Sequence, residues 1–265
     1  VLKAGSPWMT VLLGALIGVS PFAMDIYLAS MPSMTTSLAT SAPMVQLTLS
    51  VYMYGLGFGQ LFAGPLSDRY GRRSVLLGGT ALFAVASLAC AIAPSVEMLI
   101  VARLVQSLAV AACSTVPRAL VRDLLSGDDA AHMLSLMGMV LGIAPIVAPI
   151  IGGQLHVVFG WRSTFVLVTI YAVIALFAIW RSMPETLREA NHHALHPRVM
   201  ARNFNRLLHS RVFLGYFLVS CFTFCGLFAF LAGSSFVFVS VMGEGERGFG
   251  FLFGAVMLGN LTGAA

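Results

Sequence analysis

Gly64-Pro65-Leu66-Ser67-Asp68-Arg69-Tyr70-Gly71-Arg72-Arg73 is the stretch that decides the fold of this chain. It holds one aspartate and three arginines in a short gap between two long apolar runs, residues 45–63 and 74–93. Such a concentration of charge is too costly for the hydrocarbon core of a membrane. We therefore expect a tight loop at a membrane surface, joining two helices that cross the bilayer.

The composition of the whole chain supports this interpretation. Hydrophobic residues make up 58% of the chain and charged residues 9%, and the mean hydropathy is +0.92. Soluble domains carry roughly 25% charged residues, so this chain lacks the polar surface that a water-soluble protein needs. The composition predicts an all-α, polytopic membrane helical bundle.

Eight segments come near the length of about 20 apolar residues that a membrane-spanning helix needs. They are residues 8–28, 45–64, 74–93, 96–117, 133–157, 163–183, 212–242 and 249–265.

Basic residues gather on one side of these segments. If the N-terminus is inside and the segments alternate, 12 of the 15 basic residues lie on inner flanks. They are Lys3, Arg69, Arg72, Arg73, Arg118, Arg122, Arg181, Arg188, Arg198, Arg202, Arg206 and Arg211. The positive-inside rule then predicts a multi-pass protein with a cytoplasmic N-terminus. The net charge of +5 therefore reports topology, and we expect no nucleic-acid partner.

The longest polar interruption divides the chain. We expect residues 1–183 to form a six-helix bundle, residues 184–211 a cytoplasmic linker, and residues 212–265 the first two helices of an incomplete second bundle. The histidines of the linker lack a supporting cluster of carboxylates or cysteines, so no metal site is expected. Because the chain begins without Met and stops inside an apolar run, we also expect a partial sequence.

Several motifs resemble those of a known family. The pattern G-x-L-x-D-R-x-G-R-R at 64–73 resembles the loop between helices 2 and 3 of the major facilitator superfamily. Asp25-Ile26-Tyr27-Leu28 with Pro32, and Arg103-Leu104-Val105-Gln106, resemble motifs of its drug:proton antiporter family. Residues 144–153 resemble the antiporter motif of the fifth span. Together they look most like the Bcr/CflA (bicyclomycin-resistance-like) multidrug exporters.

Asp25 and Arg103 are the only acidic and basic residues deep inside predicted spans, and such residues are functional candidates by default. Both lie about two turns from the outer ends of their spans, so they can share a depth. Desolvation favours a protonated carboxyl group, so we expect Asp25 to carry the coupling proton or to meet a cationic substrate group. Arg103 would tune the pKa of Asp25, either directly or through substrate, water or Gln106. Tyr27 would lie beside these residues. The alternative is a static buried pair that joins two spans.

Two further groups of residues follow from the resemblance. A gating motif biases the two states of the transporter through contacts at the inner end of the bundle. Its candidates are Gly64, Asp68, Arg69, Gly71, Arg72, Arg73, Arg122 and Asp123. The antiporter motif bends and packs the fifth span. Its candidates are Gly142, Pro145, Pro149, Gly152 and Gly153.

The resemblance implies proton-coupled efflux of small amphipathic drugs across the bacterial inner membrane by alternating access. Partners would be a drug, a proton and the lipid bilayer, with the protein a monomer. Neither enzymatic catalysis nor a cofactor is expected. The alternatives are an exporter of a specific metabolite and a non-transporting membrane sensor.

Overall fold

The computed structural model describes residues 6–187, 190–191 and 194–264, and this part contains helices and no strand. In chain order the helices are α1 (Pro7–Asp25), η1 (Leu28–Ser30), α2 (Met31–Ser37), α3 (Ala42–Tyr70), α4 (Arg72–Ala91), α5 (Val96–Leu124), α6 (Gly127–Phe159), α7 (Arg162–Ser182), α8 (Pro197–Leu208), α9 (Arg211–Ser235), η2 (Phe236–Val241) and α10 (Glu246–Ala264). The expected all-α membrane bundle is confirmed.

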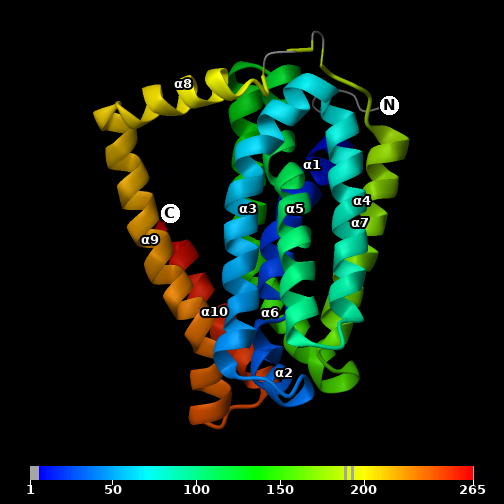
Figure 1. Ribbon diagram of the computed structural model, residues 1–265, viewed down its shortest axis with the longest axis vertical. Helices are drawn as coiled ribbons and strands as arrows, with labels where there is room; N and C mark the ends of the chain where they lie inside the picture. Colours follow the sequence, from blue (N-terminus) through cyan, green and yellow to red (C-terminus); the bar gives the residue numbers. More distant parts are fainter. Residues whose placement is uncertain (1–5, 188–189, 192–193, 265) are drawn as a thin grey trace.

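Helix α1 occupies the interior of the bundle. It contacts α5, α6 and α7, while α3, α5 and α4 lie side by side in front of it (Figure 1). Leu13, Ile17 and Ala23 of α1 are all fully buried. A helix that is apolar around its whole circumference is typical of such a central position. The first span thus lies where a residue at its end, Asp25, can reach the interior.

The structure corrects the expected loop at residues 64–73. Helix α3 continues through Asp68 to Tyr70 and α4 begins at Arg72, so Gly71 alone separates them. Gly71 has φ of +96°, a conformation that costs side-chain-bearing residues free energy. The polar stretch has to leave the hydrocarbon, but it does not have to unwind, because a helix satisfies its own backbone groups on either side of the boundary.

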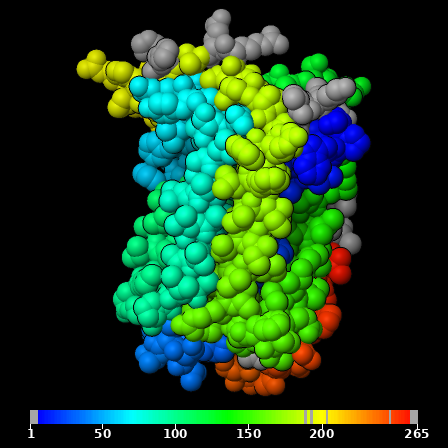
Figure 2. Space-filling model, turned by 90° about the vertical axis from the view of Figure 1, so that its right-hand side faces the viewer, coloured from blue at the N-terminus to red at the C-terminus, as the bar shows by residue number. Residues whose placement is uncertain are grey.

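Six helical segments of the described chain are long and apolar enough to cross a membrane, and not the eight expected. Glutamine, serine, tyrosine and glycine residues lower the hydropathy of α3, and the apolar part of α10 is short, Arg247–Gly259. Helices α4 and α7 lie side by side along the face shown in Figure 2. Val85, Ile174 and Phe177 on these helices are exposed, as lipid-facing side chains would be.

The linker contains a helix that the sequence analysis did not predict. Helix α8 runs sideways from one end of the bundle and leads into α9 (Figure 1). Arg198, Arg202 and Arg206 recur every four residues on one face, and Phe204 and Leu208 lie on the other. This pattern is typical of a helix that lies in a membrane interface. Lys3, Arg188, His192 and His193 lie outside the described residues.

Candidate functional site

A cavity of about 810 Å³ lies between α1, α3, α5, α6, α9 and α10. Most of its wall is apolar, including Met53, Phe224 and Phe228. Two of the lining residues are charged, Asp25 and Arg118. A mostly apolar cavity of a few hundred cubic ångströms with a small number of polar groups is typical of small-molecule sites.

Asp25 is the last residue of α1 and is 1% exposed. Its Oδ1 atom has no hydrogen-bond partner. A carboxylate in such surroundings is costly unless a proton or a cation neutralises it. Asp25 therefore presents an unsatisfied acceptor to the cavity.

Arg103 of α5 is fully buried beside Asp25 and does not line the cavity. Its Nη1 donates to the backbone oxygen of Ala23 at 3.1 Å and to Oε1 of Gln106 at 2.7 Å. Its guanidinium also lies 4.5 Å from the ring centroid of Tyr27 and 4.1 Å from that of Tyr52. Aromatic faces attract a desolvated cation by about 2 kcal/mol each, so these rings replace much of the lost hydration.

Hydrogen bonds to neighbouring segments fix the side chains that surround Arg103. Gln106 Nε2 donates to Oγ of Ser87 on α4 at 2.8 Å. The Tyr52 hydroxyl donates to the backbone oxygen of Ser20 at 3.1 Å, and the Tyr27 hydroxyl is 3.1 Å from that of Thr48. Tyr27 and Gln106 lie against Arg103, and neither is among the residues that line the cavity.

No ion pair within 4.0 Å joins Asp25 to Arg103; among the described residues, the ion pairs are those of Arg72. The Nε and Nη2 atoms of Arg103 have no hydrogen-bond partner either. Of the arrangements left open by the sequence, the direct pair is absent from this structure. Asp25 and Arg103 therefore each keep side-chain atoms that have no hydrogen-bond partner.

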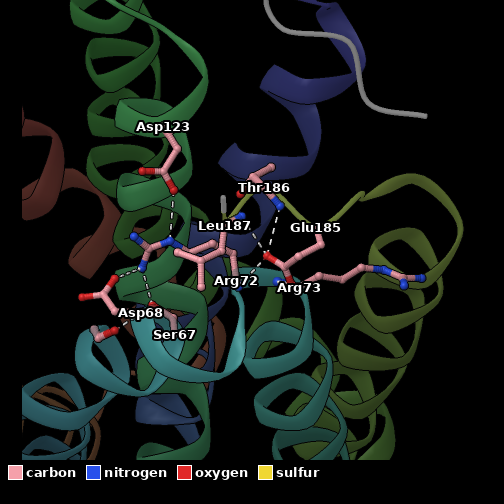
Figure 3. Close-up of polar contacts among 9 residues, drawn as sticks. Ser67, Asp68, Arg72, Arg73, Asp123, Glu185, Thr186 and Leu187 are labelled. Carbon is pink, nitrogen blue, oxygen red and sulfur yellow. Dashed lines mark hydrogen bonds and ion pairs between the residues drawn. The ribbon is translucent and has the colours of Figure 1, made fainter. Parts of the chain in front are cut away.

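A second cluster, drawn in Figure 3, lies where α3 ends and α4 begins. This is the end of the bundle from which α8 extends (Figure 1), here named the linker end. Arg72 Nη1 lies 2.6 Å from Oδ1 of Asp68, and its Nε donates to Oδ2 of Asp123 on α5 at 3.0 Å. Arg72 also donates to the hydroxyl of Ser67. These contacts tie the ends of α3, α4 and α5 together.

Glu185 completes this cluster from the linker. Its carboxylate accepts hydrogen bonds from the backbone N–H groups of Arg72 and Arg73, at 2.9 and 3.2 Å, and from those of Thr186 and Leu187 (Figure 3). The first N–H groups of a helix have no partner within it, so Glu185 caps α4. Glu185 is not among the residues predicted from the sequence for the gating motif.

The remaining gating candidates are spread over the linker end. Arg73 donates to the backbone oxygen of Trp180, and Arg69 stacks on Tyr70 at 5.2 Å. Arg122 is exposed, and Gly64 lies inside α3 opposite Thr115 of α5.

The antiporter-motif residues lie along α6. Gly142 and Pro145 line the cavity, while Pro149 and Gly153 are buried. At Gly152 the backbone oxygen of Ile26 approaches so closely that no side chain would fit. This glycine permits α6 to pack against the chain just beyond Asp25.

Arg118, which the sequence analysis placed on an inner flank, also belongs to the cavity wall. Arg118 lies inside α5 and lines the cavity with Gln60 and Ser114. The predicted span ended at Pro117, but α5 continues through it to Leu124. The sequence feature that could have indicated this place is an arginine directly after an apolar run. Within the described residues, no group of three metal-ligating side chains occurs.

Comparison with known proteins supplies the family. The model of the Major Facilitator Superfamily matches residues 13–265. The chain is 36% identical to a bicyclomycin resistance protein homolog of Haemophilus influenzae, covering 91% of this chain and 61% of that protein. It is 34% identical to a chloramphenicol resistance protein of Pseudomonas aeruginosa, covering 95% and 60%.

A bacterial homolog of the human lysosomal transporter Spinster, solved in an inward-facing and unoccupied conformation, has the same fold. The TM-score is 0.75 at 17% sequence identity, covering 95% of this chain and 60% of that one. The chain thus spans about 60% of the length of these proteins. The predicted superfamily is confirmed: this chain belongs to the Major Facilitator Superfamily of membrane transporters.

Proposed function

We propose that this chain supplies the first bundle, the linker and two further helices of a proton-coupled exporter of small amphipathic drugs in a bacterial inner membrane. The observation that carries the proposal is Asp25, a buried carboxylate with an unpaired oxygen in the wall of an apolar cavity. The resistance proteins among its relatives support a drug as the substrate.

In the proposed cycle, Asp25 exchanges a proton for a drug that occupies the cavity. Arg103 donates to the backbone oxygen of Ala23, two residues from Asp25, so its positive charge would act on Asp25, and the rings of Tyr27 and Tyr52 hold the guanidinium in place. Because the two side chains are not locked in a direct pair, protonation of Asp25 breaks no ion pair within the protein. A proton and a cationic substrate group would then compete for one carboxylate.

The linker-end cluster would bias the two states of alternating access. Contacts of Arg72 and Glu185 join α3, α4, α5 and the linker at the side that we assign to the cytoplasm, where the N-terminus would also lie. Loss of these contacts would favour one state by no more than a few kcal/mol. We propose a monomer in the lipid bilayer as the working unit.

Drug efflux from energised cells that express the complete reading frame tests the function, with and without a protonophore. We expect efflux that stops when the proton gradient collapses. Efflux that persists would remove proton coupling from the mechanism. Good membrane expression without efflux of any drug would favour a dedicated metabolite exporter or a sensor.

A further inference from the structure

Arg118 is the second charged residue of the cavity wall, and none of the motifs gives it a role. It is partly buried, and its Nη1 donates to the backbone oxygen of Ser114 at 3.2 Å. In the described part of the chain, no carboxylate lies within 4.0 Å of it. A guanidinium carries five N–H donors, so most of its capacity is unused.

Asp25 is too distant to neutralise this charge. Arg103 contacts Ala23, two residues from Asp25, and Arg118 follows Arg103 by 15 residues (118 − 103) along α5. At about 1.5 Å per residue this corresponds to ~22 Å along the helix. The cavity therefore has an acidic group near one end and a basic group toward the linker end, with apolar wall between them.

We propose that Arg118 forms a subsite for the anionic group of an amphipathic substrate. The side chains of Gln60 and Ser114, which line the same cavity, would complete this subsite. The group would be a carboxylate, sulfonate or phosphate on an apolar body. A guanidinium binds such groups through two parallel charge-assisted hydrogen bonds, which are strong away from water. The apolar body would lie against Met53, Leu56 and the phenylalanines of α9. This inference rests on the proposed function, because it names the class of substrate for that cavity.

Two dyes with one ring system test the subsite, namely anilinonaphthalene sulfonate and the uncharged N-phenylnaphthylamine. The complete reading frame is purified into phosphatidylcholine nanodiscs, and both dyes are titrated by fluorescence. We expect Arg118→Gln to weaken binding of the sulfonate about tenfold, as for one lost charge-assisted hydrogen bond, and to leave the neutral dye unchanged. Arg118→Lys should recover part of the affinity, which shows that the loss is one of charge and not of folding.

Arg181→Gln is the matched control, because Arg181 is an exposed arginine at the same end of the bundle and lies outside the cavity. Equal affinity of wild type and Arg118→Gln for the sulfonate would overturn the subsite. Equal weakening of both dyes would do the same, since it would indicate a general change in the cavity.

An anionic lipid headgroup shares the chemistry of the proposed ligand, so the titration is repeated with phosphatidylglycerol in the nanodisc. Loss of the difference between wild type and Arg118→Gln there would assign the arginine to lipid and overturn the substrate assignment. Proton-driven transport of the neutral dye in proteoliposomes is measured separately. If that transport occurs and Arg118 has no effect on the sulfonate, the proposed function stands and only the subsite fails.

Discussion

Two arginines of this bundle, Arg103 and Arg72, are held in opposite ways. Arg103 is 0% exposed and rests on aromatic rings, a backbone oxygen and the neutral side chain of Gln106. Arg72 is 8% exposed and forms ion pairs with Asp68 and Asp123.

The difference follows from the surroundings. At the linker end, water reaches the carboxylates, so several charges can gather at modest cost and their attractions are screened. Inside the bundle each additional charge is costly, so the protein surrounds Arg103 with neutral partners and leaves its charge uncompensated. In the proposed mechanism, Arg103, which has no ion-pair partner, responds to a proton on Asp25, whereas Arg72 holds helix ends together through its two ion pairs. The following experiments test that contrast.

The largest effect is expected from Asp25→Asn. The amide keeps the shape of the side chain but cannot exchange a proton at this position, so proton-driven efflux should fall to background while membrane expression is retained. The measurement is drug efflux that is sensitive to a protonophore. The control variant is Asp128→Asn, because Asp128 is an exposed carboxylate at the start of α6. Unchanged drug resistance in the Asp25 variant would contradict the proposed role.

Arg103→Lys should have the next largest effect. The ammonium keeps the charge but cannot stack its plane on Tyr27 and Tyr52, and we expect the loss of about 2 kcal/mol of stabilisation. The unfolding temperature in detergent measures the loss of stability, and the efflux rate measures the loss of transport. Tyr52→Phe is a milder variant, because it keeps the ring and loses one hydrogen bond, worth about 1 kcal/mol. If lysine supports the wild-type rate and stability, charge alone is sufficient at this position.

A smaller effect is expected from Arg72→Gln. The Asp68 side chain is 42% exposed and that of Asp123 is 30% exposed, so each ion pair contributes about 1 kcal/mol or less. The efflux rate should fall severalfold without loss of expression. In a double-mutant cycle with Asp123→Asn, the two effects should not add. Full additivity would show that the ion pair between them is energetically neutral.

Glu185→Gln should give the smallest effect. The amide oxygen still accepts the hydrogen bond from the Arg72 N–H, but the NH2 group that replaces Oε2 cannot accept the one from the Arg73 N–H. That exposed bond and the interaction with the helix dipole are lost, about 0.5–1 kcal/mol together. Glu185→Ala removes the cap as well and should cost about 1 kcal/mol more. Unfolding temperatures of the two variants measure the difference. Identical values for alanine and glutamine would mean that water replaces the cap.

Parts of the site could be read from the sequence because they depend on membrane energetics alone. A carboxylate and a guanidinium deep in apolar runs are rare enough to identify Asp25 and Arg103 without coordinates. Arg118 and Gln60 escaped detection because each lies near the end of a span, where polar residues are ordinary. Their position in the cavity wall depends on where α3 and α5 lie relative to α9 on the other side of the cavity.

The sequence by itself determined the membrane location, the helical class and the superfamily of this protein. Apolar runs of spanning length admit few other structures in lipid, since a helix satisfies its own backbone hydrogen bonds. Only the tertiary structure decided which charges are paired. It placed Arg103 on two tyrosines, joined Arg72 to Asp123 across 51 residues, and brought Glu185 onto the start of α4. These contacts depend on distances of a few ångströms between helices that are remote in sequence, and no local pattern of residues specifies such distances.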